Sequence, residues 1–249
     1  MNRPPSTDAP PRTSKRRRAD KTNASKPTSE PCCAVFADFD GTITVEETFV
    51  QMLRRFAPEP AAELIPEMYA LRVTLREGVR RIVESIPSKR FPEMLEFVGQ
   101  AEIRPGFEEL LDLLKERRVP LVVVSGGLTK IIQQVLKPYR RRVAGIHAMD
   151  VNRRAKLLRV HSEFESGTEL VSKVDVMDRY PAGSRVAIGD SVTDLNMAQS
   201  ADLTFARDKL AKYLDERDVE YVPWQDFHDV RERLESFLPP PPSSRASKR

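Results

Sequence analysis

The chain has 249 residues, of which 40% are hydrophobic, and its formal net charge is +4 at pH 7. This length suits one α/β domain with an insert or two small domains, and the hydrophobic content is sufficient to bury a core. No apolar run approaches the roughly 20 residues that a membrane-spanning helix needs, so no membrane association is expected. The two cysteines, Cys32 and Cys33, are adjacent and form neither a disulfide framework nor a metal cluster, which predicts a reducing, cytoplasmic compartment.

The positive charge is concentrated at the two ends of the chain. Residues 1–31 carry +5 and residues 239–249 carry +3, which leaves −4 on residues 32–238. Because a nucleic-acid-binding domain carries its positive charge on the folded surface, nucleic acid is expected to contact at most the basic N-terminal tail. Both tails are rich in Pro, Ser and basic residues and are predicted to be disordered. The basic run 15–18 is either a solubilising segment or a nuclear or organellar address.

Between the tails, short apolar runs alternate with segments of helical period. Buried strands are predicted at 34–37, 121–124 and 185–188, with weaker candidates at 143–148, 203–205 and 220–222. A helix is predicted after Pro105-Gly106, where Phe107, Leu110, Leu111 and Leu114 share one face. Strands that alternate with helices predict an α/β fold, a Rossmann-like doubly wound parallel sheet with helices on both faces.

One segment interrupts this alternation. Residues 45–104 contain no strand-like run and predict several amphipathic helices separated by prolines. The expected organisation is a core domain of residues 32–44 and 105–238, a helical cap of residues 45–104 inserted after the first strand, and tails at 1–31 and 239–249.

A polar cluster follows each of the three clearest strands. These clusters are Asp38-Phe39-Asp40-Gly41-Thr42, Ser125-Gly126-Gly127 and Gly189-Asp190-Ser191-Val192-Thr193-Asp194. In an open parallel sheet, ligands bind beyond the carboxyl ends of the strands. The three clusters are therefore expected to converge on one crevice, although they are far apart in the sequence.

Such a crevice has the composition of a magnesium and phosphate site. Asp38, Asp40, Asp190 and Asp194 would repel one another without a cation, and oxygen ligands suit Mg²⁺ together with a substrate phosphate. Ser125 and the amides after it are candidate phosphate donors, Gly126 permits close approach of a ligand, and Thr42 is a further substrate-binding candidate. Lys173, on a predicted helix, is expected to offset phosphate charge.

These residues support covalent phosphoryl transfer. A carboxylate beside Mg²⁺ can form an aspartyl-phosphate, and a second carboxylate two residues later can protonate the leaving alcohol and then activate water. Taken singly, each feature has a structural interpretation: Asp190 and Asp194 could cap a helix, and Lys173 could face solvent. Three clusters in order, each at the end of a strand, favour the catalytic interpretation.

The motif set resembles that of the haloacid dehalogenase (HAD) superfamily. Asp-Phe-Asp-Gly-Thr is similar to its first motif, Ser125 to its second, Lys173 to its third and Gly-Asp-x-x-x-Asp to its fourth. The resemblance implies that Asp38 is the nucleophile and Asp40 the acid/base. It also implies that Mg²⁺ binds Asp38, the Asp40 carbonyl and Asp190, with support from Asp194.

Two further resemblances bear on the substrate. A helical insert after the first motif is similar to the cap of phosphoserine phosphatases, in which an acid at about the position of Glu47 binds the substrate amino group. Segments 205–210 and 221–227 resemble the 2-hydroxy-3-keto-5-methylthiopentenyl-1-phosphate phosphatases of methionine salvage. The implied substrate is a small phosphorylated metabolite, with the methionine-salvage ester the leading candidate. Glu47 could instead be an acid favoured by a helix N-terminus.

Several alternatives stay open at this point. The chain could be a phosphoserine phosphatase, a broad-specificity small-metabolite phosphatase, or a phosphotransferase that passes the aspartyl-phosphate to an acceptor other than water. In another class, the basic tails would bind nucleic acid or an acidic partner and the fold would be a scaffold. A monomer or a homodimer is expected.

Overall fold

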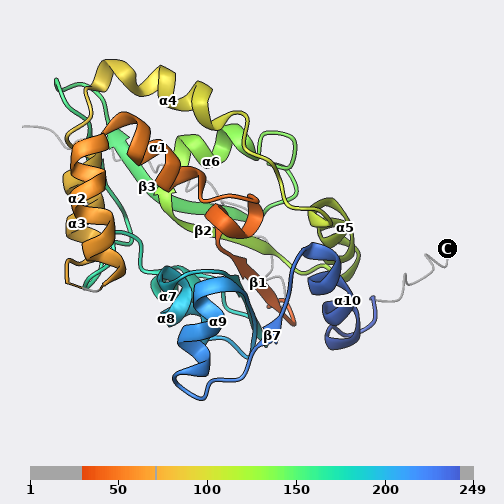
Figure 1. Cartoon of the computed structure of the whole chain (residues 1–249). Helices are drawn as coiled ribbons and strands as arrows, with labels where there is room; N and C mark the ends of the chain where they lie inside the picture. The colour runs from red at the N-terminus through yellow and green to blue at the C-terminus, as the bar shows by residue number, and fades with distance from the viewer. Residues whose placement is uncertain (1–29, 71, 242–249) are drawn as a thin grey trace, which may run out of the picture.

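The computed structural model describes residues 30–70 and 72–241, and these form a seven-stranded sheet with helices on both faces (Figure 1). The strands are β1 (Ala34–Ala37), β2 (Leu121–Leu128), β3 (Gly145–Asn152), β4 (Arg159–His161), β5 (Arg185–Gly189), β6 (Leu203–Ala206) and β7 (Val222–Pro223). They lie in the order β4-β3-β2-β1-β5-β6-β7, and all pairs are parallel except β3 with β4. The predicted doubly wound α/β fold is confirmed.

The central strand β1 shows why its sequence is continuously apolar. Side chains of a strand point alternately to opposite faces of the sheet, and both faces of this sheet are covered. Val35 belongs to one hydrophobic cluster and Phe36 to the other, and both are fully buried. An uninterrupted apolar run is therefore the expected signature of this position.

The helices are α1 (Thr48–Phe56), α2 (Pro58–Tyr69), α3 (Leu75–Val83), α4 (Phe91–Val98), α5 (Phe107–Arg117), α6 (Thr129–Val135), α7 (Lys173–Asp178), α8 (Leu195–Gln199), α9 (Asp208–Asp215) and α10 (Phe227–Phe237). Helices α5 and α10 cover the face to which Val35 points. Helices α1–α4, α7 and α8 contribute to the cluster on the opposite face. The predicted helix after Pro105-Gly106 is α5.

Residues 45–104 are here called the cap segment, and their described part (45–70 and 72–104) contains α1–α4 and no strand. Pro58 and Pro92 lie in the first turn of α2 and α4, where a missing N–H costs nothing, whereas Pro66 lies inside α2. The cap segment leaves and rejoins the core at a single antiparallel bridge between Thr44 and Ile103. Its behaviour as a separate domain stays a prediction.

Strand β4 was not predicted from the sequence. Its sequence, Arg-Val-His, has only one buried side chain, Val160, and so carries no apolar run. It is held by antiparallel pairing with the extended end of β3. The predicted disordered tails lie almost entirely outside the described residues. No helix in the described part of the chain is long and apolar enough to cross a membrane.

Candidate active site

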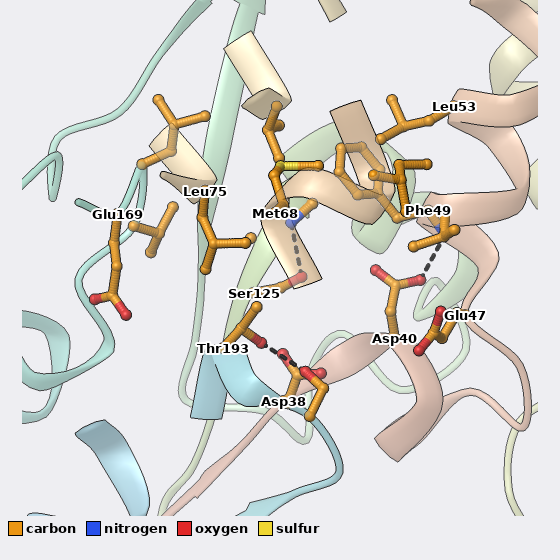
Figure 2. A pocket seen from close by; sticks show the side chains of 18 of the residues that line it. Asp38, Asp40, Glu47, Phe49, Leu53, Met68, Leu75, Ser125, Glu169 and Thr193 are labelled. Atoms are coloured by element: carbon orange, nitrogen blue, oxygen red, sulfur yellow. Dashed lines mark hydrogen bonds between the residues drawn. The ribbon is translucent and has the colours of Figure 1, made fainter. Parts of the chain in front are cut away.

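The three polar clusters meet at one edge of the sheet, as predicted. Asp38 directly follows β1 and Asp190 directly follows β5, whereas Ser125 lies inside β2, which continues past the predicted end at residue 124 to Leu128. These are three neighbouring parallel strands, so their carboxyl ends lie side by side. Asp38, Ser125 and Asp190 all line one pocket of about 120 Å³, which Figure 2 shows from close by.

Three buried carboxylates form the centre of this site. Asp38, Asp190 and Asp194 each offer an oxygen within 4.8 Å of the others, and none is more than 4% exposed. Burial, followed by the charge of Asp194, raises the pKa of Asp38 well above its usual value and that of Asp190 to about 7. The proximity of the three acids therefore has an electrostatic cost that a cation would offset.

Lys173 supplies one such cation from the protein. It is the first residue of α7, it is 2% exposed, and its Nζ donates to Asp38 Oδ1 and to Asp194 Oδ1. Burial lowers the pKa of Lys173, but the charges of Asp194 and Asp38 outweigh burial and raise it. One ammonium does not neutralise three carboxylates, so a divalent cation could offset the remaining negative charge.

The donor set fits Mg²⁺. Asp194 Oδ2 accepts hydrogen bonds from the amides of Asp190 (3.0 Å) and Ser191 (2.9 Å), so Asp194 anchors the loop and the lysine. Within the described chain, Asp38 Oδ2 and Asp190 Oδ2 accept no hydrogen bond and are free to ligate. Buried, all-oxygen ligands are what Mg²⁺ prefers.

Two glycines allow these acids to approach the backbone so closely. Gly41 has φ of +77°, and a Cβ there would lie 2.5 Å from Asp190 Oδ2. A Cβ on Gly189 would lie 2.6 Å from the carboxyl carbon of Asp194. Any side chain at either position would displace a carboxylate of the cluster.

Thr42, a predicted substrate-binding residue, lies behind the cluster. It is fully buried, and its Oγ1 donates to Asp190 Oδ1 at 2.8 Å. It orients Asp190, and its direct contact with a substrate stays a prediction.

Asp40 faces the pocket from the turn after β1, close to the cap segment. Its Oδ1 accepts a hydrogen bond from the amide of Phe49, the second residue of α1, at 2.9 Å (Figure 2). Desolvation raises the pKa of Asp40 to about 7 despite this bond. A carboxyl group with this pKa can hold a proton near neutral pH and release it in the next step, which is what an acid/base catalyst requires.

Ser125 and Gly126 line the same pocket as Asp38, Asp40 and Asp190. Ser125 is 1% exposed, and its Oγ accepts a hydrogen bond from the amide of Gly127 at 2.9 Å, which leaves its hydroxyl proton free to donate. The position of a Gly126 Cβ has no atom within 4 Å, so there is open space beside this backbone. The predicted helix after this cluster is α6, and it begins at Thr129.

The other end of the pocket is apolar and is built largely by the cap segment. Figure 2 shows Phe49, Leu53, Met68 and Leu75 on the side of the pocket away from Asp38. The remaining apolar lining residues are Val50, Ile65, Val79, Leu170 and Val171. The pocket thus joins a charged end to an apolar end.

Glu47, a predicted substrate-binding residue, lines the pocket, but its carboxylate already has partners. Its Oε2 accepts from the Tyr69 hydroxyl at 3.0 Å and its Oε1 from Lys209 Nζ at 3.3 Å. Lys209 Nζ also lies 3.9 Å from the centre of the Tyr69 ring. Lys209 belongs to α9 of the core, so this group links cap and core beside the pocket.

Several site residues were missed in the sequence. Among the described residues, Tyr69 and Glu169 line the pocket although neither belongs to a motif, and Lys209, which was given no role, contacts Glu47. No arginine of the described cap segment lines the pocket. A single tyrosine or lysine on a helix carries no local signal of its long-range partners.

A family model of haloacid dehalogenase-like hydrolases matches residues 35–199. The fold, the order of the motifs and the carboxylate cluster agree with this match, and the chain belongs to this family.

Relatives within the family carry a more specific name. A 2-hydroxy-3-keto-5-methylthiopentenyl-1-phosphate phosphatase of Microcystis aeruginosa is 45% identical over 202 residues, which cover 80% of this chain and 96% of that protein. A protein of the same name from Bacillus cereus is 30% identical over 216 residues, with 82% and 96% covered.

Solved structures support the same fold. The phosphoserine phosphatase of T. onnurineus superposes with a TM-score of 0.65 at 19% identity and covers 85% of this chain and 98% of its own. A substrate-bound phosphoserine phosphatase complex gives a TM-score of 0.62 at 20% identity, with 84% and 99% covered.

Proposed function

We propose that this chain is a Mg²⁺-dependent phosphatase that hydrolyses 2-hydroxy-3-keto-5-methylthiopentenyl-1-phosphate through an aspartyl-phosphate. Relatives with this name match the chain over 96% of their own length. The observation that carries the proposal is the two-ended pocket, in which an apolar wall faces the acids. A substrate with phosphate on carbon 1 and a methylthio group on carbon 5 has the same polarity from end to end.

The arrangement supports a two-step reaction. An oxygen of Asp38 attacks phosphorus, the ester P–O bond breaks, and the leaving oxygen takes the proton of Asp40. The Asp40 carboxylate then takes a proton from the water that attacks the aspartyl-phosphate, which releases inorganic phosphate and restores Asp38. Ser125, the amide at Gly126 and Lys173 hold the phosphoryl oxygens in line.

We propose Asp38, Asp190 and the Asp40 carbonyl as ligands of Mg²⁺, with Asp194 in support. When bound, the ion neutralises phosphate charge and draws electron density from phosphorus. Chelation with EDTA is expected to abolish phosphate release, and added Mg²⁺ to restore it. Asp190→Asn should raise the Mg²⁺ concentration for half-maximal activity by about tenfold or more. Full activity in the presence of the chelator would refute the metal site.

The direct test of the function is phosphate release from a panel of phosphomonoesters with Asp38→Asn as the control. Release confined to the methylthio ester is the expected result. Release from many unrelated esters would retain the mechanism and replace the substrate with a broad class. Transfer of phosphate to an added alcohol, without free phosphate, would identify a phosphotransferase.

Phosphoserine is the second candidate, and the same panel separates it. The similar folds of phosphoserine phosphatases and the position of Glu47 favour it. Against it, Glu47 is already paired with Lys209, and the pocket offers no arginine for a substrate carboxylate within the described chain. A charged amino acid moiety would instead meet the apolar wall, where an unpaired charge is costly.

A carboxylate introduced into the apolar wall is expected to weaken binding of the methylthio end of the substrate and to leave binding of the phosphate end unchanged. Leu75 lines the pocket at the first position of α3, where an acidic residue is compatible with the helix. Leu75→Asp should raise KM for the methylthio ester about tenfold or more, since a contact of a methyl group or two is lost and a charge is added. A short phosphate ester without an apolar tail serves as the control, and its KM should change little. Equal increases in both KM values would show that the tail does not contact Leu75.

We further propose a cytoplasmic location and a monomeric or homodimeric state, based on the unpaired Cys32 and Cys33 and on the metabolic role. Binding of nucleic acid or a protein by the basic tails falls outside the described residues. Deletion of residues 1–31 with unchanged phosphatase kinetics would separate any such binding from the reaction.

A further inference from the structure

Arg104 is a buried arginine at the junction of the cap segment and the core. It is 7% exposed and forms no ion pair within the described chain. Its guanidinium instead donates to backbone carbonyls: Nε to Thr42 O (2.8 Å), and Nη2 to Gly41 O (2.6 Å), Thr44 O (3.2 Å) and Val45 O (3.1 Å). A fifth bond joins Nη1 to Gln225 O at 3.3 Å. A charged group buried among neutral acceptors is costly, and this cost calls for an explanation.

Four of these carbonyls belong to the residues that directly follow Asp40. This turn is also held by its backbone: Arg104 N donates to Ile43 O at 2.8 Å and Val45 N to Glu102 O at 3.0 Å. Residues 41–45 are where the chain leaves the core for the cap segment, and Arg104 is where it returns. The guanidinium therefore fixes the outgoing segment from the returning one.

The same turn carries two groups of the active site. Asp40 immediately precedes Gly41, and the Thr42 hydroxyl donates to Asp190 at 2.8 Å. A planar guanidinium donates in fixed directions, so it sets the orientation of the Gly41 and Thr42 peptides. A rotation of the Gly41 peptide would move Asp40, because the two residues share the adjacent backbone.

We propose that Arg104 is a positioning residue that aims Asp40 at the leaving oxygen of the substrate. The inference rests on the proposed phosphatase reaction and adds to it a residue outside every motif. Arg104 touches neither substrate nor metal in this scheme and acts through the backbone of residues 41–45.

The leaving group provides a test that a loss of stability would not mimic. An alkyl phosphate needs a proton from Asp40 as its P–O bond breaks, whereas p-nitrophenyl phosphate expels a stable anion and needs little help. A misaimed Asp40 should therefore lower kcat/KM for the alkyl ester much more than for the aryl ester. A smaller folded fraction would lower both by the same factor.

Arg104→Lys retains the charge but loses the planar fork, and Arg104→Met removes both. We expect Arg104→Lys to lower kcat/KM at least about tenfold for the alkyl ester and less than about threefold for p-nitrophenyl phosphate. Placed in an Asp40→Asn background, the same substitution should leave the ratio of the two values unchanged. If Arg104→Met does not fold, Arg104→Lys alone decides the question.

Arg207→Met is the matched control. Arg207 stacks on Trp224 at 5.3 Å, as Arg104 does at 5.4 Å, and donates to the same Gln225 carbonyl at 2.7 Å. Within the described part of the chain, Arg207 forms no hydrogen bond to residues 41–45. Its loss should therefore leave the ratio of kcat/KM for the alkyl ester to kcat/KM for the aryl ester at the wild-type value. Equal losses for both esters in Arg104→Lys, or the same change of ratio in Arg207→Met, would overturn the inference. A wild-type protein inactive on all esters would instead refute the phosphatase itself.

Discussion

Replacement of Asp38 by Asn is expected to lower kcat at least about 10³-fold, because the amide cannot attack phosphorus or carry the phosphoryl group. The fold should persist, since Asn has nearly the same volume and Lys173 keeps its bond to Asp194. The melting temperature should be unchanged or higher, because one of three mutually repelling buried acids becomes neutral. Phosphate release and thermal unfolding of the same preparation measure the two effects.

Asp150→Asn provides the control for this substitution. Asp150 is exposed on β3 and lies outside the pocket, so its replacement should affect neither rate nor melting temperature. A rate for Asp38→Asn within tenfold of wild type would refute the assignment of the nucleophile.

Replacement of Lys173 by Met is expected to have the largest effect on stability. It removes the ammonium between Asp38 and Asp194 and leaves buried carboxylates without compensation. Removal of one partner from a buried ionic group costs about 3–5 kcal/mol, so the free energy of unfolding should fall by about this amount. Urea unfolding followed by circular dichroism measures the change.

Lys209→Met is the matched comparison, because Lys209 also pairs with a carboxylate but its side chain is 44% exposed. Solvent screens that pair, and its loss should cost less than about 1 kcal/mol. Similar costs for the two substitutions would show that burial does not set the strength of the Lys173 interactions. A second replacement, Asp194→Asn in the Lys173→Met protein, should recover part of the loss.

The parts of the site that could be predicted from the sequence are those that depend on strand order. Asp38, Ser125 and Asp190 each follow an apolar run, and parallel strands bring their carboxyl ends to one edge whatever lies between them. Lys173 could be placed on a helix before the third of these strands, and the structure has it at the start of α7.

Other features depend on contacts that no local pattern encodes. Glu47 meets Lys209 across 162 positions, and Arg104 meets Gly41 across 63. A lone basic residue has the same local context whether it faces solvent or carbonyl oxygens. Strand β4 was missed for a related reason, since its pairing with β3 substitutes for an apolar run.

The cap segment shares one hydrophobic cluster with the sheet, and this has an evolutionary consequence. Leu53 and Met68 line the pocket and also pack in the cluster that contains Phe36 of β1. A substitution that adapts the pocket to a new substrate at these positions would also remove packing from the main core. Adaptation to new substrates is therefore constrained by stability: it would proceed fastest at the half-buried pocket positions Leu75 and Val79, or after an unrelated stabilising change elsewhere in the protein.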